Sequence, residues 1–562
     1  MSKKISIYKI FVCILVGCIF AAPLIFLIYH FPILTSRVNQ NWTAIIVGSI
    51  AFFTGYSIVL FHLKDGGLVK APKEDLLTAK WMKEVNFDKY TMKVEPNRED
   101  CATWTIADNY QFLAEDIKVL KNRLNDDKYS NKIGGNSIVF GASRSGKSSN
   151  VLLPSLFHSI KGSVKPTLIC TDPKGELASL TKNFAKKNGY KVIHFTKGKD
   201  SWNPMEELWE MFHSKNVNYG DIDTEIKIMS DILVKAPIDA GSNTYFYDKA
   251  KSIVKGWLWL LLELNLTKEK TNLNWLTKEI IKEYTSENYA WVLELDKETG
   301  AGLRVSKDAY CRPYLSELLK KADTGIQAAI STAINGFDKF LSPSIKDMTS
   351  SSSFTTNDIV KTPCILYIGF DEDAPELASL LLDINYKRMN EYLNKREKLN
   401  FDRPIHYILE EFGNLPKLDF VPKAFSRDAG KNVSCMLILQ SKAQLEEIYG
   451  RNKTKELLDS TRVLIILSIA GNVEFADELS QRSGKVIRET TSKSKSKDDK
   501  DSKGSESTSD SVTLRVDRSS FLNQKVLKEI IVILQGKPAF KFDTKLWWET
   551  SYSKEMEVEN AI

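Results

Sequence analysis

The amino-acid sequence predicts an α/β protein with a mainly parallel sheet, interrupted by an all-helical segment and preceded by two membrane-spanning helices. Three observations support this prediction. Short apolar runs alternate with helical patterns on either side of a long helical stretch, which is typical of a parallel sheet covered on both faces. A glycine-rich loop joins one of the apolar runs to a helix, and two long uncharged apolar runs lie near the N-terminus.

The first element is a membrane hairpin. Residues 10–29 and 43–61 are uncharged and apolar, and each run is long enough to cross a hydrocarbon core of about 30 Å. Lysines precede the first run and follow the second, whereas the connection holds only Arg37 as a firm positive charge, which predicts that both ends are cytoplasmic. We expect residues 1–69 to form a multi-pass anchor in the cell (cytoplasmic) membrane. The alternative is that one run is a buried core helix.

The glycine-rich loop follows the apolar residues 138–140 and leads into the helix-like residues 151–157. Its glycines allow backbone N–H groups to face phosphate oxygens, Lys147 can reach the β and γ phosphates, and Ser148 can ligate Mg²⁺. The alternative is a glycine-rich surface turn. The predicted nucleotide-binding residues, with ATP and Mg²⁺ as cofactors, are Gly141, Ala142, Ser143, Arg144, Ser145, Gly146, Lys147, Ser148 and Ser149.

Two carboxylates follow the apolar strand 405–409. A phosphate-binding loop needs one carboxylate at the tip of a neighbouring strand to hold Mg²⁺ and usually a second one to polarise the attacking water. Glu410 and Glu411 supply both, so Glu410 is predicted to hold the metal together with Ser148. Taken alone, an acidic pair after a strand is more often a solvated strand end.

Other candidates stand at the ends of the remaining strands. Asp172 and Lys174 lie in a Pro/Gly turn after strand 167–172, where they could line the nucleotide or relay its state. Gln440 ends strand 436–439 and could sense the γ phosphate. Arg427 could reach a neighbouring subunit's phosphate as an arginine finger, with Lys431 and Arg462 as competitors.

The domain boundaries follow from changes in pattern. Residues 70–205 are expected to hold a connector and the first part of the nucleotide domain. Helical periodicity, strongest in 221–235 and 246–264, then predicts an all-α domain over 206–345. Strand patterns resume within 346–562, the second part of the nucleotide domain. A Ser/Lys/Asp-rich stretch at about 490–511 predicts a disordered surface loop.

Composition narrows the function only slightly. The net charge of +7 gives a mild preference for polyanions or anionic lipid and does not by itself indicate nucleic-acid binding. The seven cysteines are scattered and show no CxxC spacing typical of a zinc site.

Taken together, these motifs resemble the type IV secretion coupling proteins, membrane-anchored ATPases that deliver DNA–protein substrates to a conjugation channel. The resemblance covers nearly the whole chain and follows the family's order. Besides the two apolar runs and the loop 141–148, the segments that match are Thr171–Leu177 (TDPKGEL), Trp202–Pro204 (WNP), Phe246–Ala250 (FYDKA), Leu409–Leu415 (LEEFGNL) and Leu439–Leu445 (LQSKAQL) with Tyr449–Gly450.

The resemblance implies a RecA-like nucleotide domain that assembles as a homo-hexameric ring below the membrane, with the all-α domain at its cytoplasmic mouth. It implies that Lys147 and Ser148 bind ATP–Mg²⁺ and that Glu411 is the catalytic glutamate. Two positions depart from the family: Glu410 stands where Asp is usual, and Arg144 stands where a further Gly is common. These departures leave hydrolysis plausible and suggest that it is slow.

The sequence thus predicts an ATPase that recruits a relaxase-bound single-stranded DNA to a type IV secretion channel. Lys147, Glu411, Gln440 and Arg427 are the predicted catalytic residues. One alternative is a double-stranded DNA pump of the chromosome-segregation type. The helical insertion and the turn that contains Asp172 favour the coupling function over this alternative. The other is a docking receptor for protein substrates in which ATP binding is structural.

Overall fold

The structure is a computed structural model that describes residues 135–557 and three short strands before them. The strands are β1 (Thr91–Lys93), β2 (Thr105–Ile106) and β3 (Tyr110–Phe112), which pair in the order β1-β3-β2. Within 135–557 the residues not described are 163–164, 237–243, 265, 286–307, 316–323, 371–373, 395–402, 428–432, 470, 495–504, 515, 536–538, 545 and 551–552.

The two predicted membrane spans, 10–29 and 43–61, lie outside the described residues. Within the described part, no helix combines the length and apolarity that crossing a membrane requires. The chain divides into two units, one of residues 81–484 and 516–562 and the other of residues 1–80 and 485–515.

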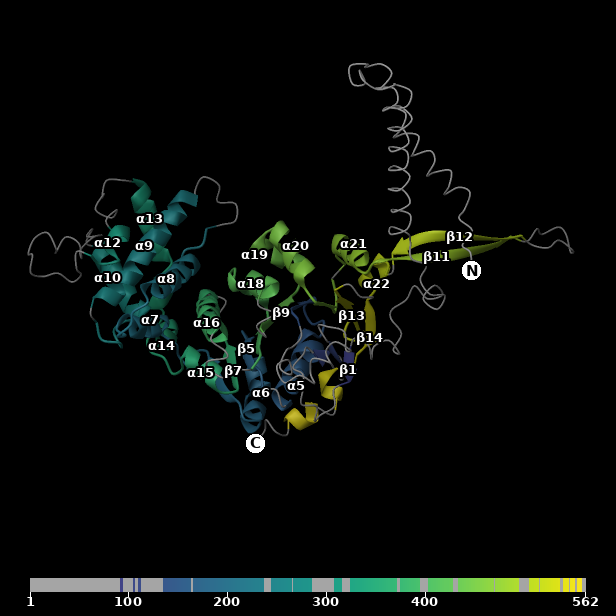
Figure 1. Ribbon diagram of the computed structural model, residues 1–562, viewed down its shortest axis with the longest axis horizontal. Coiled ribbons are helices and arrows are strands. Elements are labelled where there is room, and N and C mark those ends of the chain that lie inside the picture. The colour runs from purple at the N-terminus through teal and green to yellow at the C-terminus, as the bar shows by residue number, and fades with distance from the viewer. Residues whose placement is uncertain are drawn as a thin grey trace, which may run out of the picture. The chain divides into compact units, whose positions relative to one another are not determined.

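The larger unit is built on a nine-stranded mixed sheet in the order β14-β13-β10-β4-β9-β8-β5-β7-β6. Figure 1 labels β5, β7, β9, β13 and β14 of this sheet. The strands from β10 to β6 are parallel to their neighbours, and β13 and β14 are antiparallel. The arrangement confirms the predicted α/β class. The strands are β4 (Ser137–Phe140), β5 (Thr167–Thr171), β6 (Lys191–Phe195), β7 (Cys364–Ile368), β8 (Ile405–Leu409), β9 (Val433–Leu439), β10 (Val463–Ile466), β13 (Glu529–Leu534) and β14 (Phe540–Asp543).

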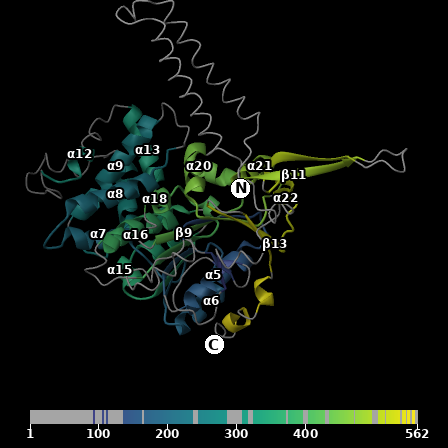
Figure 2. The same cartoon turned by 45° about the vertical axis from the view of Figure 1, so that its right-hand side comes forward.

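Both faces of the sheet are buried. Along β4, Ile138 and Phe140 belong to one hydrophobic cluster and Val139 to the other, because successive strand residues point to opposite faces. The cluster of Val139 includes residues of α5 (Leu153–Lys161) and α6 (Glu176–Lys187). Figure 2 shows α5 and α6 together on one side of the central strands.

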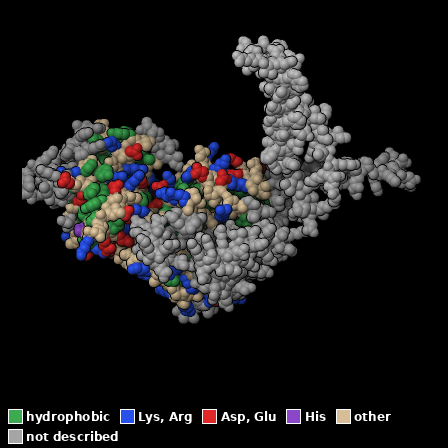
Figure 3. All heavy atoms as spheres, viewed as in Figure 1, with side chains coloured by type: hydrophobic (Ala, Val, Ile, Leu, Met, Phe, Trp, Pro, Cys, Tyr) green, Lys and Arg blue, Asp and Glu red, His purple; other side chains and the backbone are tan. Residues whose placement is uncertain are grey.

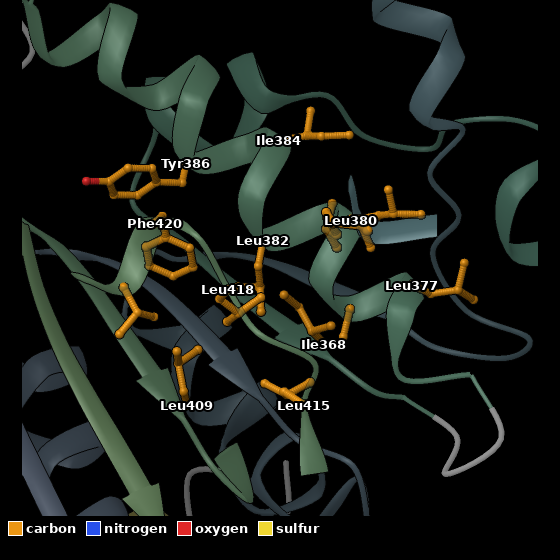
Figure 4. Packing of buried hydrophobic residues seen from close by; sticks show 14 of the residues in the cluster. Ile368, Leu377, Leu380, Leu382, Ile384, Tyr386, Leu409, Leu415, Leu418 and Phe420 are labelled. Carbon is orange, nitrogen blue, oxygen red and sulfur yellow. The ribbon is translucent and has the colours of Figure 1, made fainter. Parts of the chain in front are cut away.

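The opposite face packs against helices that follow β7, β8, β9 and β10. Figure 4 shows Leu382 of α16 near Leu409 of β8 and Phe420 of α18, while Leu377 and Leu380 lie farther along α16. The helices on this side are α16 (Glu376–Asn394), the 3₁₀ turn η7 (Phe412–Asn414), α18 (Phe420–Ser426), α19 (Lys442–Tyr449), α20 (Arg451–Ser460), α21 (Val473–Arg482) and α22 (Arg518–Leu522). A last 3₁₀ turn, η9 (Trp547–Glu549), packs through Trp547 with the cluster of Val139.

Between β6 and β7 the described chain is helical. The helices predicted at 221–235 and 246–264 are α8 and α9, and the helical region continues to Lys361, beyond the expected boundary at 345. Its elements are α7 (Pro204–Phe212), α8 (Tyr219–Leu233), α9 (Thr244–Glu263), α10 (Leu273–Thr285), α12 (Arg312–Leu315), α13 (Thr324–Asn335), η6 (Asp338–Leu341), α14 (Pro343–Thr349) and α15 (Thr356–Lys361).

A buried ion cluster joins this helical segment to α16. The carboxylate of Glu225 on α8, which has no exposed surface, accepts hydrogen bonds from Arg388 Nη2 (2.7 Å) and Nε (3.0 Å) of α16. Lys387 Nζ donates to Glu225 at 3.4 Å, and Arg388 also pairs with Glu207 of α7. Charge pairing therefore fixes α7 and α8 to a helix of the sheet domain.

The smaller unit contains a hairpin where the sequence predicts a disordered loop. Strands β11 (Lys485–Ser494) and β12 (Ser505–Leu514) pair antiparallel over their full length, from Lys485↔Leu514 to Ser494↔Ser505. Residues 495–504 are not described. The low-complexity composition predicted disorder because no apolar core is available to these residues. Pairing of the two backbones nevertheless forms a hairpin here.

Candidate nucleotide-binding site

The loop Gly141–Ser148 leaves β4 at the carboxyl edge of the parallel strands. It closes on itself with a turn in which Ser145 N–H donates to Ala142 O at 3.2 Å. A Cβ on Gly141 would lie 2.4 Å from Ser145 Oγ, so only glycine allows this closure. Gly146 has φ 89°, a left-handed backbone that glycine adopts without cost. A π-helical turn, η3 (Ser148–Leu152), then leads into α5.

Lys147 folds back over the loop. Its Nζ donates to Gly141 O at 2.8 Å and to Ala142 O at 3.1 Å. Burial lowers the pKa of Lys147, while the carboxylates of Glu411 and Glu410 oppose this shift and nearby Lys174 adds to it. The ammonium group is thus close to both glutamates and is held by backbone oxygens of the loop.

Ser148 and Glu410 meet across the sheet edge, although 262 positions separate them in the chain. Ser148 Oγ donates to Glu410 Oε1 at 3.0 Å, and the backbone oxygen of Glu410 accepts from Thr171 Oγ1 at 2.8 Å. Burial raises the pKa of Glu410 to about 7, with smaller contributions from Asp172 and Glu411 and an opposing one from the Ser148 hydroxyl. A loop hydroxyl and a strand-end carboxylate are the oxygen ligands that hold Mg²⁺ in proteins with a phosphate-binding loop.

Glu411 occupies a left-handed backbone position with φ 49° and ψ 40°, which is uncommon for a residue other than glycine. Its Oε2 accepts a hydrogen bond from Gln440 Nε2 at 3.3 Å. Gln444 Oε1 accepts from the backbone N–H of Gln440 at 2.8 Å and so holds the end of β9. A Cβ on Gly413 would lie 2.4 Å from the Gln444 side chain, so the turn after β8 packs closely on α19.

Asp172 is almost fully buried, and its carboxylate accepts from the backbone N–H groups of Leu177 (3.2 Å) and Ala178 (2.8 Å) at the start of α6. Burial raises its pKa, and these hydrogen bonds counteract the rise. Both oxygens therefore hold a helix terminus, which is a structural task. Lys174 is exposed in the same turn and lies close enough to Lys147 to lower its pKa.

Arg427 is exposed at the end of α18. Asp383 of α16 accepts from Phe420 N–H at 3.1 Å at the start of this helix, and Asn136 Nδ2 donates to Ala424 O at 3.1 Å within it. Of the two competitors, Lys431 lies outside the described residues, and Arg462 Nη1 donates to Gln535 Oε1 at 2.8 Å. The Arg462 side chain thus already has a partner, and Arg427 remains the first candidate.

The loop fits a triphosphate. Ser145 Oγ and Asn150 Nδ2 are buried and find no hydrogen-bond partner among the described residues, which marks polar capacity left over for a ligand. Lys147, the Ser148 hydroxyl and the loop backbone are the donors that phosphate binding requires. Ser148 and Glu410 together fit the metal that accompanies a nucleotide.

The structure brings together Lys147, Ser148, Glu410 and Glu411, with Gln440 contacting Glu411. Thr171 and Gln444 were not among the sequence candidates. Both lie in segments that carry the family resemblance, Thr171–Leu177 and Leu439–Leu445, and that was the signal available for them. Thr171 bonds to the backbone of Glu410 and Gln444 bonds to the backbone of Gln440. These partners could not be predicted, because they depend on which strands are neighbours in the sheet.

Comparison with known proteins gives the following matches. Residues 96–561 match the protein family described as type IV secretory system conjugative DNA transfer. Protein VirD4 of Agrobacterium fabrum is 23% identical over 368 residues, which cover 64% of this chain and 50% of that protein. The type IV secretion system-coupling protein VirD4 of Bartonella henselae is 19% identical over 384 residues, which cover 66% of this chain and 57% of that protein. The chain spans about half the length of the curated relatives it matches.

Among solved structures, the chain is similar to the plasmid coupling protein TrwB in complex with the non-hydrolysable ATP analogue ADPNP. The TM-score is 0.48 at 15% sequence identity, and the match covers 85% of this chain and 96% of that chain.

Proposed function

The chain belongs to the type IV secretory system conjugative DNA transfer family, and on that premise we propose that it is the coupling ATPase of such a system. In this proposal a RecA-like motor domain binds ATP–Mg²⁺ and recruits a relaxase-bound single-stranded DNA to the secretion channel. The observation that supports it best is the convergence of the loop Lys147 and Ser148 with Glu410 at one edge of the parallel sheet.

Each residue of the site has a task in this proposal. Lys147 would exchange its bonds to Gly141 O and Ala142 O for the β and γ phosphates. Ser148 and Glu410 would hold the metal, which supplies charge neutralisation of the phosphates when bound. Glu410 must be ionised for this, so its raised pKa favours metal binding at neutral pH and above.

Glu411 is placed to orient water for attack on the terminal phosphate. Its carboxylate accepts a hydrogen bond from the side-chain amide of Gln440. Gln440 follows β9, the strand that lies between β8 and β4. Glu411 has a left-handed backbone, and strained positions of this kind cluster at catalytic sites. We propose that Gln440 restrains Glu411 and senses the terminal phosphate.

Arg427 is proposed to act on the nucleotide of a neighbouring subunit in a hexamer. It is exposed, it ends a helix anchored at two points, and an arginine finger supplied in trans stabilises charge in the transition state of phosphoryl transfer. The two apolar runs at 10–29 and 43–61 are proposed to anchor the ring to the membrane, with both termini cytoplasmic.

DNA contact is proposed to come from many separate phosphate contacts. On the face shown in Figure 3, basic and acidic side chains of the described residues are interspersed. Binding would then depend on salt and tolerate changes in DNA sequence.

ATP hydrolysis by the full-length protein in detergent tests the proposal. ATP turnover should rise when single-stranded DNA is added and should be lost in Lys147→Ala. In cells, the wild type and this variant should insert into the membrane equally. Stimulation by double-stranded DNA alone would favour a duplex pump. ATP binding without turnover in assembled rings would favour a docking receptor, and wild-type turnover in Lys147→Ala would refute the assignment of the loop.

A further inference from the structure

The turn Lys525–Lys528 lies beside the phosphate loop, on the side away from Glu410. It immediately precedes β13, which runs antiparallel to β10 with Ile466 opposite Ile531. The first residue of β13, Glu529, therefore lies at the edge where β10 and β4 end. Because the sheet order is β13-β10-β4-β9-β8, this turn and Glu410 flank the loop from opposite sides.

Leu527 in this turn approaches the loop directly. A Cβ on Gly146 would lie 3.0 Å from Leu527 Cδ2 and 2.8 Å from the unpaired Nδ2 of Asn150. The backbone of Leu527 is left-handed, with φ 65°. That conformation is unfavourable for a residue with a Cβ, and such strained positions concentrate at ligand-binding sites.

The turn is fixed by hydrogen bonds on several sides. Gln524 Nε2 donates to Ile466 O at 2.7 Å and to Glu529 O at 2.8 Å. Thr544 Oγ1 donates to Leu527 O at 3.2 Å. These contacts hold the strained backbone in place and keep an aliphatic side chain against the loop.

The orientation of a bound nucleotide follows from the metal site. Ser148 and Glu410 lie on the β8 side of the loop, so the terminal phosphates belong there and the nucleoside belongs on the β10 and β13 side. A nucleobase has a flat apolar face, and Leu527 offers an apolar surface at this position. On the basis of the proposed function, we propose that Leu527 is the wall against which the base of the bound nucleotide packs.

The test compares ATP with inorganic tripolyphosphate, which lacks the base, on the full-length protein with Mg²⁺. In Leu527→Asp the affinity for ATP should fall about tenfold, because an apolar contact of roughly 1.4 kcal/mol is replaced by a charge. The affinity for tripolyphosphate should stay within about twofold. Val526→Asp introduces the same charge one position away, at a side chain that is 49% exposed, and serves as the matched control.

A second variant guards against misfolding. Leu527→Gly suits the left-handed backbone, so it should melt no lower than the wild type and yet bind ATP several-fold more weakly. As an independent readout, 8-azido-ATP should photolabel the segment around Leu527, as mapped by mass spectrometry.

The outcomes separate this inference from the proposed function. If the wild type binds neither ATP nor tripolyphosphate, the proposed function itself fails. If ATP binds the wild type and both Leu527 variants equally, Leu527 is not the wall and the nucleotide site stands. Three other results would also overturn the inference. They are an equal loss of affinity for ATP and tripolyphosphate in Leu527→Asp, an equal loss of ATP affinity in Val526→Asp, and a photolabel confined to another segment.

Discussion

Arg144 and Glu411 both occupy left-handed backbone positions, at φ 60° and 49°, in the two loops that meet at the site. Each position costs roughly 1–2 kcal/mol relative to glycine. Only for Arg144 did the sequence hint at this strain, because the family resemblance implies a glycine at that position. The strain at Glu411 could not be foreseen, since it depends on how the turn after β8 packs on Gln444.

Arg144→Gly should raise the free energy of unfolding by about 0.5–1 kcal/mol and keep ATP binding, because glycine accepts the left-handed backbone without strain. Urea denaturation with a binding assay checks this. Ser143→Gly is the control: Ser143 is the exposed neighbour without a positive φ, and glycine there should be neutral or destabilising. A loss of ATP affinity in Arg144→Gly would show that the arginine contacts phosphate.

Glu410→Gln should stabilise the ligand-free protein at alkaline pH. Burial raises the pKa of Glu410 to about 7, so the folded state holds this proton more tightly than the unfolded state. Stability from this group is full below about pH 4.5 and is lost as the pH rises through about 7. We expect the variant to gain roughly 1–2 kcal/mol at pH 8 and clearly less at pH 5.

Melting temperatures of both proteins at pH 5 and pH 8 measure this difference. The variant should also bind ATP more weakly in the presence of Mg²⁺, because the neutral amide is a poorer ligand than a carboxylate. Equal melting temperatures at pH 8 would contradict the raised pKa.

Among the elements, α16 has contacts in two directions. Near its C-terminal end, Arg388 and Lys387 pair with Glu225 of the helical segment. In its middle, Asp383 accepts from backbone N–H groups at the start of α18, the helix that ends at Arg427. Burial, with a smaller effect of Asp419, raises the pKa of Asp383 to about 7. One helix thus links the helical segment to the proposed arginine finger.

Arg388→Met should destabilise the protein by about 3–5 kcal/mol, because it leaves the buried Glu225 without its main partner. Adding Glu225→Gln should recover at least half of that loss, since the uncompensated charge is then gone. Denaturant melts of the two single variants and the double variant give the coupling energy. Additive effects would mean that the two side chains do not act as a pair.

At this scale the sequence predicted the strands at 138–140, 167–172, 405–409 and 436–439, because each is a short apolar run followed by a polar turn. It did not predict their order in the sheet, which arises from contacts between distant residues. The hairpin β11–β12 was predicted wrongly as a disordered loop. Its composition is typical of disorder, and composition does not reveal that the two backbones pair.

At the scale of the whole molecule, the hairpin β11–β12 belongs to a different unit from the nucleotide site. Its ends, Lys485 and Leu514, are paired opposite each other, so a short linker can replace residues 487–512 without spreading the flanking chain. We expect this deletion to leave the melting temperature and the ATP affinity unchanged, because the nucleotide site lies in the other unit. Aggregation or loss of ATP binding would show that the hairpin supports the fold of the larger unit.

The place of the helical segment in the sheet order has an evolutionary consequence. The segment leaves from β6, the last strand of the sheet, and returns through β7 beside it, whereas the phosphate loop follows β4, in the interior of the sheet. Residues between β6 and β7 can therefore be lengthened, shortened or replaced without changing any neighbour of β4. Lineages can vary the helical segment while the residues of the phosphate loop keep the same neighbours.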